Sequence, residues 1–234
     1  MAIWPICLIV SQLNVWFSRR KKASFAVGHM ALAYLLGKGS AKPLKVNLNI
    51  PLILVLSIIP DLDIIFFNEL HRGPTHSIIT ALLVFIPFFV IYRQKAVPYF
   101  LALASHSLIG DFFIGGHIML FWPLSSNLYG NYWFYIKIWD PINIILEWTL
   151  FAISTVIMFR NNDIFAFFQN NKSNLVLAIP IATVLLPTFV SYPLQVPILL
   201  ITPHLFYLVL FSISIFIVIF RIPNRKKGVN RSLS

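Results

Sequence analysis

Long apolar runs constrain this chain more than any other feature of its sequence. A transmembrane helix needs about 20 predominantly apolar residues. The chain has 234 residues, of which 59% are hydrophobic and 11% charged, whereas a soluble domain is about 45–50% apolar and about 25% charged. We therefore predict an all-α fold, a polytopic membrane bundle of about six to seven transmembrane helices. The apolar runs lie at roughly 3–17, 48–67, 77–92, 96–119, 141–159, 175–192 and 197–220.

One further run, 25–37, is too short to cross a bilayer alone. Thirteen residues of helix cover only about 20 Å. We expect a re-entrant or interfacial helix there, carrying His29.

The ends of the chain set the expected domain limits. Residues 1–23 form a hydrophobic run followed by a basic cluster, the reverse of a secretory signal, so we expect an uncleaved anchor. Residues 24–222 are expected to form one membrane-embedded domain, with a motif core at about 25–125. Residues 223–234 are expected to be a basic cytoplasmic tail.

The distribution of the basic residues predicts the orientation. The net charge of +11 sits mainly in clusters that flank apolar runs, as expected for juxtamembrane charge rather than for a nucleic-acid surface. With the amino terminus outside, only Arg72 and Lys137 of the 18 basic residues fall on the outer side. We therefore expect a multi-pass protein of the plasma membrane, in contact with the lipid bilayer and not with nucleic acid, whose polar residues near 58–80 face the extracytoplasmic side.

Histidines and acids concentrate in the first half of the chain. Five of the six histidines and four of the seven acids lie between residues 29 and 117. Imidazole and carboxylate are the usual ligands of zinc and related divalent ions. Bound cations would also neutralise carboxylates that are costly near lipid. The clustered residues are His29, His71, His76, His106, His117, Asp61, Asp63, Glu69 and Asp111.

Local geometry partly agrees with one site. Pro60 is expected to break its helix and turn Asp61 and Asp63 toward a cavity. Thr75 is expected to cap the next helix and place His76 in the first turn. His106 and Asp111 are five residues apart, about 140° on a regular α-helix. A π-bulge or a loosening of the helix near Gly110 is needed to bring them together.

Each of these residues also has a purely structural interpretation. The two aspartates can end a helix, the histidines near residue 74 can be interfacial loop residues, and His106 can hydrogen-bond a neighbouring helix. His29 can be a ligand or a satisfied core histidine. We expect His117 to lie around the site without binding metal, and His204 to be structural. Asp140 before Pro141 is expected to be a helix N-cap, whereas Glu147, deeper in that helix, needs a partner and is a site candidate.

The segments "GHMALAYLLG", "PDLD", "HRGPTHS", "SHSLIGD" and "LFWP", in this order, resemble the YdjM-like membrane-bound metal-dependent hydrolases. That family is grouped with zinc-dependent phospholipase C and P1 nuclease proteins. The resemblance covers about residues 25–125. In relatives the histidine and aspartate of the fourth motif are commonly one helical turn apart, whereas here the gap is five residues. The resemblance implies these metal-site residues: His29, Asp61, Asp63, His71, His76, His106 and Asp111.

We therefore expect a hydrolase with two or three divalent ions, zinc before others, and a phosphoester of a lipid or lipid-linked molecule as substrate. A metal-activated water would attack the scissile bond. The candidate catalytic residues are Asp63 as a bridging carboxylate and base, Arg72 for the phosphoryl group, and Glu147. The alternative is a divalent-cation or proton-coupled transporter. The apolar inner half of most runs and the lack of an inverted repeat argue against that alternative.

Overall fold

The computed structural model describes residues 26–63, 72–115, 117–130, 140–189 and 197–221. Within these ranges the chain is helical apart from its connections, and its only β contact is a bridge between Ile118 and Tyr129. This agrees with the predicted all-α fold. The expected anchor at 1–23 and tail at 223–234 lie outside the described residues.

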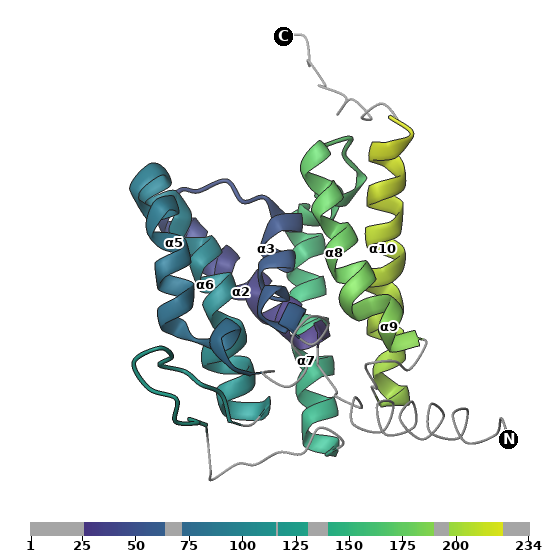
Figure 1. The fold of residues 1–234 in the computed structure, drawn as a ribbon. Coiled ribbons are helices and arrows are strands. Elements are labelled where there is room, and N and C mark those ends of the chain that lie inside the picture. Colours follow the sequence, from purple (N-terminus) through teal and green to yellow (C-terminus); the bar gives the residue numbers. More distant parts are fainter. Residues whose placement is uncertain (1–25, 64–71, 116, 131–139, 190–196, 222–234) are drawn as a thin grey trace, which may run out of the picture.

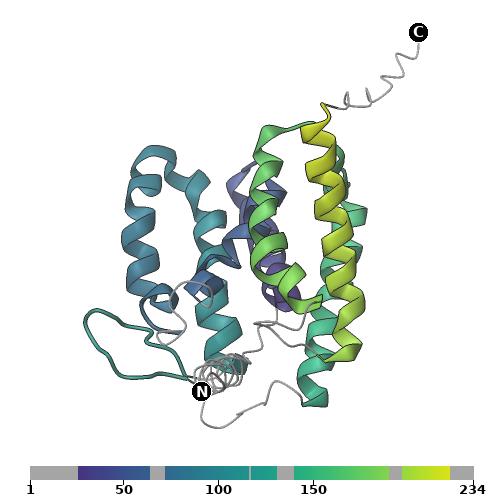
Figure 2. The ribbon, with the colours of Figure 1, turned by 45° about the vertical axis from the view of Figure 1, so that its right-hand side comes forward.

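The helices form two groups around a central pair. α2 (Ala26–Leu44) and α3 (Ile50–Leu56) lie between the pair α5 (Ile78–Tyr92) and α6 (Val97–Ser105) and the group α7, α8 and α10 (Figures 1 and 2). The remaining α- and π-helices are η5 (His106–Gly115), α7 (Pro141–Arg160), α8 (Ala178–Pro180), η8 (Ile181–Leu185), α9 (Leu186–Phe189) and α10 (Ile201–Ile219). Short 3-10 segments join them: η1 (Ile59–Leu62), η3 (Pro74–His76), η4 (Arg93–Ala96), η6 (Asp163–Phe168), η7 (Lys172–Leu177) and η9 (Ile198–Leu200).

Four helical tracts among the described residues are long and apolar enough to cross a membrane. They are Ile78–Phe113, Pro141–Arg160, Lys172–Phe189 and Ile198–Ile219. The protein is therefore a membrane protein with transmembrane helices, although the expected six to seven spans are not confirmed.

The first of these tracts folds back on itself. Arg93 takes a positive φ of 49°, and α5 and α6 then run side by side (Figures 1 and 2). Phe85 and Phe89 of α5 pack against Phe100 of α6, with ring centroids 5.5 and 5.4 Å apart. The outer face of α5 is highly exposed, with Val90 at 73%. Such a face would be an association hazard in water, but it suits contact with lipid.

α2 is longer than the expected helix at 25–37, and it lies at the centre of the bundle. Its side chains are mostly buried, Met30 and Tyr34 completely so. Tyr34 belongs to a core cluster with Phe151 of α7 and Tyr207 of α10. Small residues on α2 allow its neighbours to approach the backbone closely. A Cβ at Gly37, for example, would meet Ile53 of α3 at 3.0 Å. Close approach at small residues is the usual mode of helix packing in lipid.

The expected span at 48–67 is broken. α3 has seven residues, about 10 Å of helix, which cannot cross a bilayer. Asn49 caps its start by accepting a hydrogen bond from Leu52 N–H at 3.1 Å. The helix ends at Leu56, and the 3-10 segment Ile59–Leu62 that contains Pro60 follows, as expected from the missing proline N–H. Residues 64–71 lie outside the description, so the rest of this run is not placed.

Candidate metal centre

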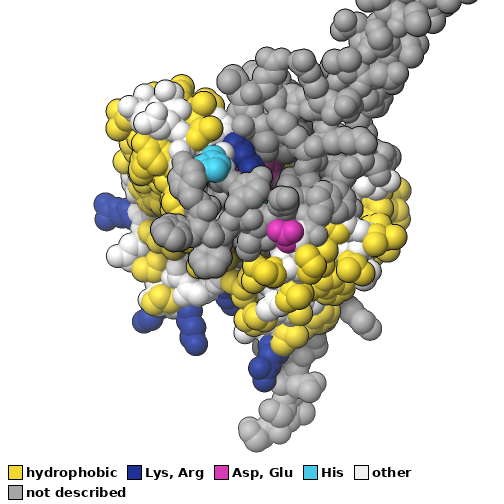
Figure 3. Space-filling view, turned by 90° about the horizontal axis from the view of Figure 1, so that it is seen from below, with side chains coloured by type: hydrophobic (Ala, Val, Ile, Leu, Met, Phe, Trp, Pro, Cys, Tyr) yellow, Lys and Arg dark blue, Asp and Glu magenta, His cyan; other side chains and the backbone are white. Residues whose placement is uncertain are grey.

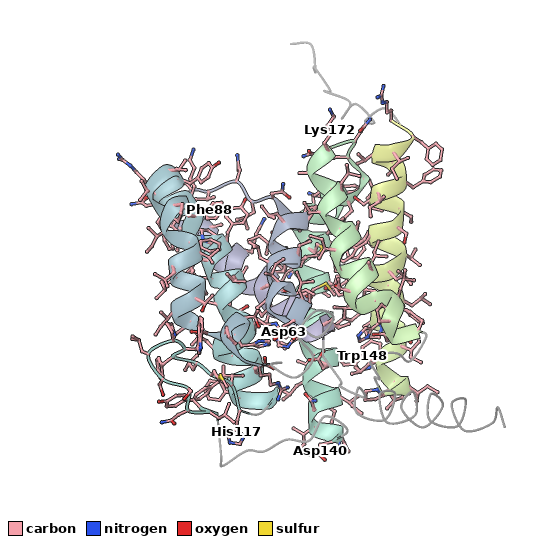
Figure 4. The ribbon with its side chains drawn as sticks, in the orientation of Figure 1. Asp63, Phe88, His117, Asp140, Trp148 and Lys172 are labelled. Carbon is pink, nitrogen blue, oxygen red and sulfur yellow. The ribbon has the colours of Figure 1, made fainter. Side chains whose placement is uncertain are left out.

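The interrupted helices bring their polar residues to one buried place beneath α2 and α3. Asp61 comes from η1, with Asp63 directly after it, and His76 comes from η3. His106 and Asp111 come from η5. All five are buried, with exposed fractions of 5% or less. In Figure 4 the Asp63 label marks this region, between the ends of the bundle.

A π-helix aligns His106 with Asp111. The segment His106–Gly115 follows α6 without a break and is a π-helix, in which the hydrogen bonds run between residues five apart. His106 Nε2 lies 3.3 Å from Asp111 Oδ2. The expected loosening near Gly110 is therefore present, and the five-residue gap is the spacing that a π-helix needs.

Four donor atoms face one another at the centre. His76 Nε2 and His106 Nε2 are 3.2 Å apart. Asp111 Oδ2 lies 3.1 Å from the first nitrogen, and Asp61 Oδ1 lies 3.5 and 3.4 Å from the two nitrogens. Five of the six distances in this four-atom set thus fall between 3.1 and 3.5 Å. These four atoms are called the donor cluster below.

The backbone break at Pro60 also orients His106. In a continuous helix Ser57 O would accept the N–H of residue 61, but here Asp61 N–H bonds Ile58 O instead. The freed Ser57 carbonyl accepts a hydrogen bond of 2.7 Å from His106 Nδ1. A proton on Nδ1 leaves the lone pair of the neutral ring on Nε2, toward the donor cluster.

Thr75 likewise directs the Nε2 lone pair of His76 toward the donor cluster. Its hydroxyl donates to Asp63 Oδ2 at 2.7 Å and lies 3.0 Å from His76 Nδ1. Because the hydroxyl proton goes to the carboxylate, the hydroxyl oxygen accepts from Nδ1–H. The expected role of Thr75 as a helix cap is wrong. Ser77 caps α5, accepting hydrogen bonds from the N–H groups of residues 79 and 80, and His76 lies just before that helix.

The donor cluster is chemically suited to a cation. Two imidazole lone pairs and two carboxylate oxygens face each other out of water, which is unfavourable without a proton or cation between them. Asp111 Oδ2 is buried and lies 3.1 and 3.3 Å from the two imidazole nitrogens. Burial alone would lower the pKa of His76, but hydrogen bonds to Asp111, Asp61 and Asp63 raise it well above its ordinary value. Both observations indicate a strong local demand for positive charge, and Asp61, His76 and His106 could hold a metal ion.

His29 extends the cluster from α2. Its ring stacks on that of His106 at a centroid distance of 4.0 Å. His29, His106 and Asp111 form a second buried group whose ligand atoms lie within 4.8 Å of one another. Gly110 makes this approach possible, because a Cβ there would collide with the His29 imidazole. The structure therefore places His29 among the candidate ligands rather than in the apolar core.

Arg72 reaches the cluster from its edge. One guanidinium nitrogen lies 3.5 Å from Asp111 Oδ1, and its backbone N–H donates to Asp63 Oδ2 at 3.3 Å. Its φ of 67° is uncommon for a side chain other than glycine. The side chain is 22% exposed. The positively charged guanidinium of Arg72 therefore lies between the buried donors and the surface.

Glu147 takes a different place from the one expected for a cluster residue. It is 4% exposed, and its Oε2 accepts a 2.6 Å hydrogen bond from Gly28 N–H in the first turn of α2. The first N–H groups of a helix have no acceptor within the helix, and this side chain supplies one. A Cβ at Gly28 would collide with the Glu147 carboxylate. Glu147, on α7, therefore binds the residue of α2 that precedes His29. It belongs to neither of the two metal-ligand groups found among the described residues.

Among the described residues, three others that the sequence singled out, His117, Asp140 and His204, belong to neither metal-ligand group. His71 and Glu69 are outside the described residues. Figure 4 shows His117 and Asp140 at the lower end of the molecule, well below Asp63. Asp140 directly precedes α7 as its N-cap residue. His204 is buried and bonds Leu200 O of the preceding turn at 2.7 Å, as expected for a structural histidine.

Sequence reasoning missed two positions that shape the site. Ser57 contributes only a backbone carbonyl, which carries no sequence signal. Gly28 matters only because Glu147 lies against it, 119 positions along the chain. Gly110, in contrast, could be found from the mismatch between the five-residue spacing and a regular helix.

The chain is similar to a family of known membrane proteins. A sequence model of the YdjM inner membrane protein family matches residues 25–195, more than half of the chain. No curated protein and no solved structure matches this chain.

Proposed function

The chain belongs to the YdjM inner membrane protein family, and we propose that it is a membrane-bound metal-dependent hydrolase acting on a phosphoester of a lipid or lipid-linked substrate. The donor cluster carries this proposal. Four buried nitrogen and oxygen donors converge there within 3.1–3.5 Å along five of their six edges.

The spacing of the donors favours zinc. In a tetrahedral site with metal–ligand distances of about 2.0–2.1 Å, the ligand atoms are about 3.3–3.4 Å apart. Five of the six distances in the donor cluster, 3.1–3.5 Å, are close to that spacing. The second group shares His106 and Asp111 with the donor cluster and adds His29, a further donor for the two or three ions of this proposal.

The residues around the donors suit hydrolysis. Ions bound there would lower the pKa of a coordinated water and polarise the phosphoester. Asp63 lies beside them with its Oδ2 held by Thr75 and Arg72, which fixes its orientation as a proton acceptor. The Arg72 guanidinium, partly exposed at the edge of the cluster, would neutralise a phosphoryl oxygen. Glu147 would act indirectly, through the first turn of α2.

The charge distribution supports an extracytoplasmic site. Figure 4 shows Lys172 at one end of the bundle, with Asp140 and His117 at the other, on the side nearer Asp63. Basic residues concentrate on the cytoplasmic side of membrane proteins. The Asp63 side would then face outward, and its depth between the middle and the end of the bundle would suit a substrate held by its lipid in the membrane.

The arrangement of the donors favours hydrolysis over transport. A transport path needs polar groups through the depth of the bilayer. Both metal-ligand groups found in the described part of the chain share His106. They therefore form one site and not a series of sites across the bilayer.

Two measurements on detergent-purified protein test the proposal. Elemental analysis should find two or three zinc ions per chain in the wild type and a clear loss in a His76→Ala/His106→Ala variant. The matched control is His204→Ala, which removes a buried histidine bound to its own helix and should keep the metal. Hydrolysis of bis(p-nitrophenyl) phosphate and of short-chain phospholipids should follow metal content across the three proteins.

The two measurements separate the parts of the proposal. Stoichiometric metal without hydrolysis of any phosphoester would overturn the enzyme and keep the metal centre. Metal-dependent ion flux in proteoliposomes would instead support the transporter. Absence of metal from the folded wild type, even after zinc is added back, would overturn both.

A further inference from the structure

The loop Ile118–Tyr129 is a defined element at the site end of the bundle. Two backbone hydrogen bonds between Ile118 and Tyr129, of 2.9 and 2.8 Å, close its base. The ring of Phe121 packs edge-on against Tyr129 at 4.9 Å. It is the teal loop at the lower left of Figures 1 and 2.

The loop is joined to the first residues of a transmembrane tract. The Ser77 hydroxyl lies 2.6 Å from Trp122 O and 3.1 Å from Leu120 O, and Ile78 N–H donates to Leu120 O at 3.0 Å. Ile78 begins the apolar tract Ile78–Phe113. The loop is therefore held at the depth where α5 enters the membrane.

The loop is uncharged, and apolar side chains flank the three polar residues Ser125, Ser126 and Asn127 at its tip. Residues 117–130 contain no Asp, Glu, Lys or Arg. Four large apolar side chains are exposed in this loop: Phe121 at 40%, Trp122 at 38%, Leu124 at 83% and Leu128 at 52%. An apolar environment would be favourable for Leu124, because moving apolar surface out of water is favourable. Figure 3 views the molecule from this end and shows exposed hydrophobic side chains around its rim.

We propose that the loop Ile118–Tyr129 is an interfacial anchor whose exposed apolar side chains insert into the boundary between lipid headgroups and acyl chains. Tryptophan and tyrosine are enriched at that depth, because their rings are apolar and their N–H or O–H groups are polar. The occupant of this surface is the bilayer itself. The proposal requires only that the chain is a membrane protein and does not depend on the hydrolase.

The anchor has a consequence for the donor cluster. Ser77 follows His76 directly, and Arg72 O accepts a 2.9 Å hydrogen bond from Met119 N–H. The loop is thus bonded on both sides of the segment that carries His76. Its insertion would hold that segment, and with it the edge of the cluster, at a constant depth in the membrane.

Spin labelling tests the insertion directly. Cys7 is the only cysteine in the chain, so a Cys7→Ser background allows single labels. Leu124→Cys is labelled with a nitroxide in nanodiscs of phosphatidylethanolamine and phosphatidylglycerol, and its collision rates with oxygen and with a water-soluble nickel chelate are compared. Val90→Cys on α5 gives the lipid reference, and Lys172→Cys at the opposite end gives the water reference.

The insertion predicts an oxygen-to-nickel ratio for Leu124 several-fold above that of Lys172 and approaching that of Val90. A ratio equal to that of Lys172 would overturn the proposal, because the tip would lie in water. Inaccessibility to both reagents would also overturn it, since another protein surface would then cover the tip. Monodisperse elution and wild-type metal content serve as folding controls, and Leu128→Cys replaces Leu124→Cys if that variant fails them.

Discussion

Two small groups that bind no metal hold the imidazoles of the donor cluster. His106 Nδ1 is occupied by the carbonyl of Ser57, and His76 Nδ1 by the hydroxyl of Thr75. Such partners select the tautomer and the ring orientation of a ligand histidine, and their loss typically costs 10–100-fold in metal affinity. At the scale of single residues, the site therefore depends on atoms outside the ligand set.

Replacing Thr75 tests this dependence. Thr75→Val keeps the shape of the side chain but removes the hydroxyl that links Asp63 and His76. We expect zinc affinity to fall by about tenfold or more, measured by competition with a chromophoric chelator, while Thr75→Ser retains most of it. The control is Thr149→Val, because that hydroxyl bonds only Ile145 O of its own helix. Unchanged affinity in Thr75→Val would rule out the orienting role.

Gly110 should respond to alanine in the direction opposite to most helical glycines. Gly→Ala within a helix usually stabilises by up to about 1 kcal/mol. A Cβ at Gly110, however, would collide with the His29 ring, and overpacking of this kind costs about 1–3 kcal/mol. We expect Gly110→Ala to lower the unfolding temperature in detergent and to reduce bound metal.

Gly39→Ala is the matched control for that substitution. Gly39 also lies in a helix, and a Cβ there would meet nothing within 4 Å. It should leave metal content unchanged and should not lower stability. A Gly110→Ala protein that behaves like Gly39→Ala would show that His29 does not need this close approach.

At the scale of elements, the site depends on departures from regular helix. The 3-10 turn at Pro60 frees a carbonyl, and the π-helix after Ser105 turns Asp111 onto the side of His106. The first turn of α2 is also held by contacts on two sides. Gly110 of the π-helix lies against His29 on one side, and Glu147 of α7 binds Gly28 on the other. The first turn of α2 is therefore positioned by two elements that are distant in sequence.

Variants of Glu147 distinguish a positioning role from a catalytic one. Glu147→Ala leaves the buried Gly28 N–H without its acceptor, which costs about 1–3 kcal/mol. We expect it to lower the unfolding temperature and weaken metal binding. Glu147→Gln keeps an acceptor oxygen of the same reach and should retain metal binding and most activity. A Glu147→Gln protein that binds metal and is inactive would show that the carboxylate itself takes part in the reaction.

At the scale of the whole molecule, charge and polarity separate along the bundle axis. Lys172 lies at one end, Asp140 at the other, and the tracts between them are apolar. The separation matters for the proposed hydrolase, because it bears on the side from which a substrate would reach Asp63. The orientation of the bundle in the membrane therefore decides which compartment supplies the substrate.

Cysteine accessibility in intact cells measures that orientation. In the Cys7→Ser background, we expect Asp140→Cys to react with a membrane-impermeant maleimide added outside. Lys172→Cys and Arg93→Cys should react only after the membrane is permeabilised, because basic residues favour the cytoplasmic side. The reverse pattern would put the donor cluster toward the cytoplasm and contradict the extracytoplasmic site.

The sequence by itself determined the class of fold and most of the candidate ligands. Apolar runs indicate membrane helices because backbone polar groups in lipid must be paired within the segment. The spacing of His106 and Asp111 also indicated a π-helix, because five residues do not share a face on an α-helix. These features are local, since each depends on residues within a single apolar run.

Only the tertiary structure decided the rest. Length and hydropathy alone did not show that α2 is a long, central helix, nor that α3 stops after seven residues. They also did not show that Thr75 serves Asp63 rather than a helix end, or that Glu147 meets Gly28 across 119 positions. The reason is physical: a hydrogen bond or a close approach between distant segments depends on how helices pack, and no residue type specifies its partner in advance.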